Sequence, residues 1–316
     1  MLEMKKRQTN SPRAAYGKTL AQLGEENKNI VVLDADLSCS TQTCIFAKAF
    51  PERFFNVGIA EQDLMTTAAG LATTGKIPFV STFAMFATGR AWEQIRNTIA
   101  YPNFNVKIVS THGGITVGED GASHQALEDV ALMRLIPNMM VIVPADCKET
   151  SEAIKFAADY DGPVYIRISR TSVPDIFDES YKFDHTKSYV LKEGKDATVV
   201  TNGETLIEVL DAAELLKQKG IELEVIHMPT VKPFDRKVLL SSAKKTGMVF
   251  TVENHSIIGA LGSAVCETLA EGLPTRVCRI GTYDRFGQSG EQRVLMAHYG
   301  LTSDKLAEKI KAVLRQ

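Results

Sequence analysis

Short apolar runs alternate with helical segments along almost the whole chain, and polar or glycine residues follow most of the runs. Runs rich in Val and Ile occur at 30–34, 77–80, 106–110 and 164–168, and their short length is typical of buried strands. Helical segments, among them one predicted at 87–100, separate these strands. Such alternation predicts an α/β fold in which a parallel sheet is covered by helices on both faces.

A second, smaller unit of the same kind follows the first. Strands are predicted at 197–201, 223–227, 248–252 and 276–280, with helices between them whose apolar residues recur at helical spacing. Periodicity fades between the two units. We therefore predict two α/β/α domains, at 1–172 and 195–316, joined by a linker at 173–194.

Bulk properties exclude several classes of protein. The formal net charge is −2, which gives no electrostatic reason to expect nucleic acid or a membrane surface as partner. No apolar run has the length needed to span a bilayer, and the first ten residues lack the apolar core of a signal peptide. The five cysteines form no C-x-x-C pair and are expected to be free thiols. A cytoplasmic protein is therefore expected.

The stretch around Glu61 most needs an explanation. The apolar run that contains Phe54 and Phe55 predicts a buried strand or loop, and a helix is predicted next, with Glu61 in its first turn and Gly75 just past its end. This helix is rich in Ala, Gly and Thr, which let another backbone approach closely, so we expect it to pack against a second subunit. Glu61 is either a first-turn acid favoured by the helix dipole or a functional carboxylate shielded from water.

Polar side chains follow the predicted strands, at the edge where open α/β sheets bind ligands. Asp36 follows the strand at 30–34, and His112 follows the strand at 106–110, with Asp120 and His124 further along the same loop. Two histidines and an acid so placed favour a ligand pocket. A metal site and a Ser/His/Asp hydrolase are alternatives, although the spacing fits no short metal motif and no G-x-S-x-G is present.

Three further residues have both a structural and a functional interpretation. Arg170 closely follows the strand at 164–168 and is either an anion clamp or a partner in a surface ion pair. Phe83 and Phe86 follow the strand at 77–80 and are either core residues or flat faces for a ring.

Several motifs, taken in their order and spacing, resemble the transketolase family. They are G-I-x-E at 58–61, T-F-x-x-F at 82–86, T-H at 111–112, G-E-D-G-x-S-H-Q at 118–125 and P-N-M at 137–139. The resemblance covers nearly the whole chain. It implies the pyrimidine-binding domain and the carboxy-terminal domain of that family, the latter with a mixed sheet. The chain resembles the second subunit of a split transketolase.

The resemblance implies thiamine diphosphate as cofactor, whose ylid carries the hard chemical step. The glutamate that matches Glu61 hydrogen-bonds the ring nitrogen of the aminopyrimidine, and a shielded carboxylate can share a proton with that nitrogen. Phe83 and Phe86 match the residues that stack on the pyrimidine. Asp36 matches an acid that lines the cofactor pocket.

The resemblance also implies a site for a phosphorylated sugar. Asp120 resembles the acid that contacts a substrate hydroxyl, and His124 resembles the histidine near the ketose hydroxyl and carbonyl. Together with Glu61 these two residues form the implied catalytic set. The positions that match the family's sugar-phosphate site are Arg13, Ser40, His112 and Arg170.

The implied reaction moves a two-carbon ketol unit from a ketose phosphate to an aldose phosphate, as in the pentose phosphate pathway. The sequence has no Gly-Asp-Gly…Asn metal motif, so we expect an N-terminal transketolase subunit to hold the diphosphate and Mg²⁺ in a dimer of heterodimers. No metal ligands are expected in this chain. A subunit similar to deoxyxylulose-phosphate synthase, which shares G-I-A-E-Q, and a non-catalytic partner with a degenerate pocket are the alternatives. Gly89 stands where many relatives place a third aromatic residue.

Overall fold

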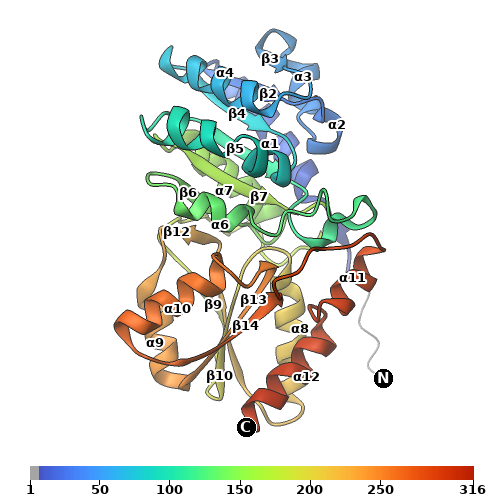
Figure 1. Cartoon of the computed structure of the whole chain (residues 1–316), viewed down its shortest axis with the longest axis vertical. Coiled ribbons are helices and arrows are strands. Elements are labelled where there is room, and N and C mark those ends of the chain that lie inside the picture. Colours follow the sequence, from blue (N-terminus) through green and yellow to red (C-terminus); the bar gives the residue numbers. More distant parts are fainter. Residues whose placement is uncertain (1–6) are drawn as a thin grey trace.

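The computed structural model describes residues 7–316. Residues 1–6, which belong to the segment without signal-peptide character, lie outside the described residues. Two α/β units lie one above the other along the long axis of the molecule, with the amino-terminal unit at the top of the view (Figure 1). Within residues 7–316, no helix is long and apolar enough to cross a membrane.

The first sheet has seven strands in the order β12-β6-β7-β5-β4-β2-β3. All neighbours pair in parallel except β12, which is antiparallel to β6. The predicted parallel α/β architecture is therefore confirmed. The strands are β2 (Ile30–Asp34), β3 (Phe54–Asn56), β4 (Ile77–Ser81), β5 (Lys107–Thr111), β6 (Met140–Ile142), β7 (Val164–Ile168) and β12 (Thr230–Lys232).

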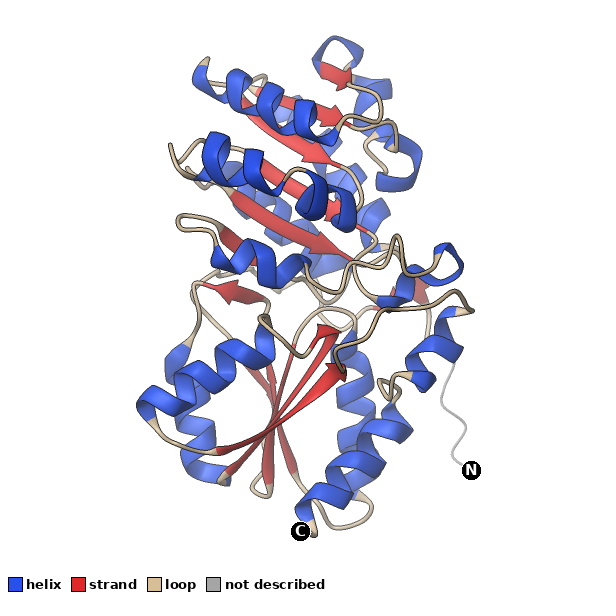
Figure 2. Cartoon of the chain, viewed as in Figure 1, coloured by secondary structure: helices blue, strands red, loops and turns tan. Residues whose placement is uncertain are grey.

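Helices cover both faces of this sheet (Figure 2). Two of them begin at side-chain caps, because Ser11 accepts a hydrogen bond from the amide of Ala14 and Asp146 accepts one from the amide of Glu149. The helical segments are α1 (Pro12–Glu26), α2 (Ser38–Thr41), α3 (Cys44–Ala49), η1 (Pro51–Arg53), α4 (Glu61–Thr73), η2 (Phe86–Arg90), α5 (Trp92–Gln94), η3 (Ile95–Ala100), η4 (Ile115–Asp120), α6 (Asp129–Leu135) and α7 (Cys147–Asp159).

The second sheet has the strand order β14-β13-β10-β11-β9. Strands β10, β11, β13 and β14 are parallel, whereas β9 is antiparallel to β11, so the expected mixed sheet is confirmed. The elements are β9 (Tyr189–Lys192), β10 (Ala197–Thr201), α8 (Thr205–Lys217), β11 (Leu223–His227), α9 (Arg236–Thr246), β13 (Met248–Ser256), α10 (Leu261–Gly272), β14 (Arg276–Thr282), α11 (Gln292–His298) and α12 (Ser303–Leu314).

Strands cross the expected domain limits. β12 follows β11 in the chain yet joins the first sheet, and β1 (Thr9–Asn10) pairs with β8 (Val173–Pro174), which lies in the expected linker. The segment 173–194 also contains β9, which belongs to the second sheet. The domain limits at 172 and 195 stay a prediction. Strands from beyond these limits pair with strands of the other unit or of the expected linker.

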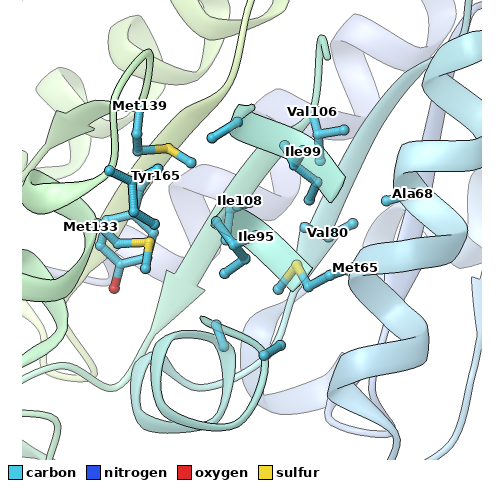
Figure 3. Close-up of a cluster of buried hydrophobic side chains, with 14 of the residues drawn as sticks. Met65, Ala68, Val80, Ile95, Ile99, Val106, Ile108, Met133, Met139 and Tyr165 are labelled. Carbon is cyan, nitrogen blue, oxygen red and sulfur yellow. The ribbon is translucent and has the colours of Figure 1, made fainter. Parts of the chain in front are cut away.

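A core beneath α4 fixes that helix on the first sheet. Met65 and Ala68 of α4 are fully buried and belong to one cluster with Val80 and Ile108 of the sheet (Figure 3). Burying a large apolar side chain contributes roughly 1.5–3 kcal/mol, so several such contacts hold the helix firmly. The first residue of α4, Glu61, is positioned by this packing.

Two local predictions were wrong. The helix expected at 87–100 is interrupted: η2 and η3 are turns of π-helix, and the short α5 lies between them. The apolar run before Gly58 was expected to be buried, but Phe55 is 41% exposed because β3 is the edge strand of its sheet. The outer face of α4, at Thr66 and Gly70, is exposed in the single chain, so its packing against a second subunit stays a prediction.

Candidate functional site

The candidate residues gather at the carboxyl-terminal edge of the first sheet. Asp36 follows β2, Phe83 follows β4, His112 follows β5 and Arg170 follows β7. Because these strands are parallel and adjacent, their ends bring residues far apart in sequence to one edge. The edge predicted from strand ends alone is therefore where the candidate groups lie.

Two of these residues have an uncommon backbone conformation. Asp36 has φ 65° and His112 has φ 62°, both in the left-handed region that residues other than glycine rarely adopt. Each is held there directly after a buried strand. Non-glycine residues in this region cluster at functional sites, where the surrounding structure overcomes the local strain.

Glu61 is the buried acid of the site. Its side chain is 4% exposed, and Arg90 Nη1 lies 3.1 Å from Oε1 and 3.2 Å from Oε2. The guanidinium carbon of Arg90 also lies 4.6 Å from the centre of the Phe86 ring. The sequence motifs assigned Arg90 no role, although its position four residues after Phe86 was a local signal that the two side chains could meet.

Aromatic and imidazole rings line the space next to this acid. Phe83 and Phe86 lie nearly parallel, with ring centroids 5.8 Å apart and planes at 18°. The ring of His112 stacks on Phe83 at 3.7 Å, and His124 meets Phe86 edge-on at 5.1 Å. Two residues expected to contact the cofactor and two expected to contact the sugar therefore form one continuous cluster.

A cationic group lies at the other end of this cluster. Arg13 donates from Nη1 to the carbonyl of Ser40 at 2.6 Å and from Nε to the carbonyl of Arg170 at 3.1 Å. Burial, followed by the charges of Arg13, Arg170 and His124, lowers the pKa of His112 to about 3. The imidazole of His112 is therefore neutral at physiological pH, and the positive charge comes from the two arginines.

The short helix α2, which carries Ser40, is anchored by a buried acid. The carboxylate of Asp34 accepts hydrogen bonds from the amide of Leu37 at 2.6 Å and from the hydroxyls of Thr41 at 2.7 Å and Thr43 at 2.8 Å. Burial raises the pKa of Asp34. These contacts fix the turn after β2, which brings the Ser40 carbonyl to Arg13.

Two of the expected site residues are exposed to solvent. Asp36 is exposed and accepts a hydrogen bond from Asn56 Nδ2 at 2.9 Å. Asp120 is exposed at the end of η4, and no other side chain among residues 7–316 hydrogen-bonds its carboxylate. No group of three or more His, Cys, Asp and Glu side chains suited to a metal occurs in the described part of the chain.

A separate cleft lies away from the candidate residues. About 1060 Å³ in volume, it lies between β1, α8 and α11, and none of the candidate residues lines it. Acidic side chains outnumber the two arginines, Arg7 and Arg293, on its wall, and this balance disfavours an anionic ligand. The candidate groups therefore lie outside this cleft, at the sheet edge.

Comparisons with known proteins agree on one family. The description "Transketolase, pyrimidine binding domain" matches residues 9–175, and "Transketolase, C-terminal domain" matches residues 186–306. A Methanocaldococcus jannaschii protein described as "Putative transketolase C-terminal section" is 52% identical over 96% of this chain and 96% of its own length. A Clostridium sp. protein described as a 6-deoxy-6-sulfo-D-fructose transketolase subunit is 41% identical over 93% of this chain and 91% of its own length.

A solved structure is similar throughout. It is described as "Split gene transketolase, inactive beta4 tetramer", and it matches with a TM-score of 0.90 and 53% identity over 96% of this chain and 98% of that chain.

Proposed function

The chain belongs to the transketolase family, and we propose that it is the subunit that holds the pyrimidine end of thiamine diphosphate in a split transketolase. The proposed enzyme transfers a two-carbon ketol unit from a ketose phosphate to an aldose phosphate. One observation supports the proposal most strongly. A buried carboxylate, two parallel phenyl rings and two arginines lie at one sheet edge, and they belong to Glu61, Phe83, Phe86, Arg13 and Arg170.

The residues present fit the aminopyrimidine. Glu61 offers a carboxylate that is 4% exposed, so it can hold a ring nitrogen away from competing water. The parallel rings of Phe83 and Phe86 offer apolar faces next to that carboxylate. When bound, thiamine diphosphate supplies the nucleophilic carbon that takes up the two-carbon unit. Glu61 would hold and share the proton at the ring nitrogen.

The remaining candidate residues would orient the sugar. His124 projects toward the same rings, with Nδ1 3.0 Å from the hydroxyl of Ser123, and is proposed to contact the ketose hydroxyl and carbonyl. Asp120 is proposed to accept a hydrogen bond from a sugar hydroxyl. Asp36, at the end of β2, is proposed to line the cofactor pocket.

The anionic end of the substrate has a matching charge. Arg13 and Arg170 supply two guanidinium groups, and the neutral His112 beside them can donate or accept a hydrogen bond without adding charge. The relative described as acting on a sulfonated sugar also handles a substrate with an anionic terminus. We therefore propose that Arg13, Ser40, His112 and Arg170 hold the sugar phosphate.

A second polypeptide is proposed to complete the site. Relatives that match this chain over more than nine-tenths of their own length are described as a section or a subunit of transketolase. The companion would hold the diphosphate and Mg²⁺, in a dimer of heterodimers. The five cysteines are free, which fits a reducing compartment such as the cytoplasm.

The test is reconstitution. The chain is mixed with the diphosphate-binding subunit, thiamine diphosphate and Mg²⁺, and xylulose 5-phosphate with ribose 5-phosphate is assayed beside pyruvate with glyceraldehyde 3-phosphate. We expect turnover of the first pair only, and Glu61→Ala should reduce it by about 10²- to 10⁴-fold, since an essential proton-transfer group is lost.

Glu52→Ala, at an exposed acid on η1, is the matched control and should keep full activity. Turnover of the pyruvate pair would assign the chain to an enzyme similar to deoxyxylulose-phosphate synthase. No turnover of either pair, with both subunits folded, would favour a non-catalytic partner. Near-normal activity of Glu61→Ala would remove Glu61 from the reaction.

A further inference from the structure

Arg90 makes contact with both groups that the aminopyrimidine needs. Its Nη1 atom bridges the two carboxylate oxygens of Glu61, at 3.1 Å and 3.2 Å, and its guanidinium carbon lies 4.6 Å from the centre of the Phe86 ring. Arg90 is the last residue of η2, and neither the sequence motifs nor the family descriptions gave it a role.

This contact pairs the buried carboxylate of Glu61. Within residues 7–316, Arg90 is the one side chain that donates a hydrogen bond to the Glu61 carboxylate, and that carboxylate belongs to a side chain only 4% exposed. A ring nitrogen that approached the same oxygens would therefore meet the guanidinium first. The two ligands compete for one acceptor.

The guanidinium also has the shape and polarity of the group it would compete with. It is flat, it carries N–H donors along its edge, and it stacks on aromatic faces, as a protonated aminopyrimidine does. Arg90 combines a hydrogen bond to a carboxylate with a contact to a phenyl ring, which is the pair of interactions expected for the cofactor ring.

We propose that Arg90 is a stand-in for the aminopyrimidine, occupying Glu61 and Phe86 until the cofactor displaces it. This inference rests on the proposed function. Arg90 is thus a residue that sets cofactor affinity: it keeps the buried carboxylate paired while the ring is absent, and it must leave before the ring can bind.

The side chain is free to leave, whereas its backbone is held. The Arg90 side chain is 55% exposed, so its guanidinium can rotate into solvent, and the Glu61 carboxylate, which is 4% exposed, stays paired only if the ring nitrogen takes its place. Gln62 Nε2 donates to the Arg90 carbonyl at 3.3 Å, which ties this end of η2 to α4. The side chain can therefore rotate into solvent without moving the segment that carries Phe86.

Competition between Arg90 and the cofactor should change the dissociation constant of the cofactor by a measurable factor. An ion pair and a cation–π contact that share the 55% exposed Arg90 side chain together correspond to a change in dissociation constant of about three- to thirtyfold. Removing the guanidinium should tighten cofactor binding by that factor, because the cofactor no longer has to displace it.

Isothermal titration calorimetry tests this on the reconstituted pair of subunits, with thiamine diphosphate titrated in the presence of Mg²⁺ at one fixed ionic strength. Arg90→Ala should lower the dissociation constant about three- to thirtyfold. Arg90→Lys, which keeps the charge without the flat face, should give a smaller gain. Arg96→Ala, at an exposed arginine of η3, is the control and should bind as the unmodified chain does.

The outcomes separate this inference from the proposed function. Weaker or unchanged cofactor binding by Arg90→Ala, while the unmodified pair binds and Glu61→Gln weakens binding, would overturn the stand-in role alone. Weaker binding would instead make Arg90 a part of the cofactor site. If the unmodified pair bound no cofactor, or Glu61→Gln bound normally, the proposed function itself would fall and this inference with it.

Discussion

Nε2 of His227 lies 2.8 Å from Oε2 of Glu149, and both side chains are fully buried where the two α/β units meet. His227 ends β11 of the second unit, whereas Glu149 lies in the first turn of α7 in the first unit. The hydroxyl of Tyr181, from the segment between the units, donates to Oε1 of the same carboxylate at 2.5 Å. One carboxylate therefore connects both units and the segment that joins them.

His227→Ala should destabilise the chain by about 3 kcal/mol, because Glu149 would stay buried after losing one of its donors. The measurement is the midpoint of urea unfolding followed by circular dichroism. His298→Ala, at an exposed histidine of α11, should change the stability by less than about 0.5 kcal/mol. A similar small effect for both variants would show that the His227–Glu149 contact adds little.

Arg170→Ala should raise the KM for xylulose 5-phosphate by about ten- to a hundredfold with little change in kcat, because the proposed charge-assisted hydrogen bond to the phosphate would be lost. The side chain is placed for this role by its hydrogen bond to the carbonyl of Val117 and by its ion pair with Glu119 at 3.2 Å. The same variant should use unphosphorylated erythrulose as the unmodified chain does. Equal losses on both substrates would point to a disturbed fold.

His112 should make stability depend on pH below neutrality. The folded-state pKa of His112, about 3, lies below its ordinary value of 6.5. Between these two pH values the unfolded chain binds a proton at His112 and the folded chain does not. Stability is therefore complete above pH 6.5 and declines as the pH falls toward 3. Between pH 6.5 and 4.5 the loss due to His112 should be about 2–3 kcal/mol.

The comparison is with His112→Asn, whose unfolding free energy should fall less steeply over the same pH range. Urea unfolding at half-unit pH intervals gives both slopes. His255, whose pKa is lowered to about 4 mainly by burial, is present in both chains and cancels in the difference. Parallel slopes would mean that His112 is protonated in the folded chain.

Gly287 should not tolerate a side chain, because a Cβ there would lie 1.8 Å from Oε1 of Gln125. Gln125 donates from Nε2 to the carbonyls of Gln288 at 3.0 Å and Ile115 at 3.1 Å, so it fastens the loop before Asp120 to the second unit. Gly287→Ala should destabilise the chain by about 1–3 kcal/mol in urea unfolding.

Gly70→Ala is the matched control. A Cβ at Gly70 meets nothing within 4 Å, and the residue lies inside α4, so alanine should stabilise the isolated chain by about 0.5–1 kcal/mol. If Gly287→Ala left the free energy of unfolding unchanged, the Gln125 side chain or the 283–291 loop would be able to move aside without loss of stability.

The sequence by itself determined the main elements and the edge at which the candidate residues lie. Strands β2, β10 and β11 were predicted at their observed limits. These signals are local, because apolar periodicity and caps depend on residues within one or two turns. The rule that parallel strands place their carboxyl ends at one edge then located the candidate residues.

Only the tertiary structure decided what those residues contact. The entry of β12 into the first sheet, the exposure of Phe55 and the break in the helix expected at 87–100 depend on which neighbours each segment meets. The Glu149–His227 and Glu61–Arg90 pairs join residues 78 and 29 positions apart. Periodicity within a segment carries no information on such pairs, because they form only when packing brings separate elements together.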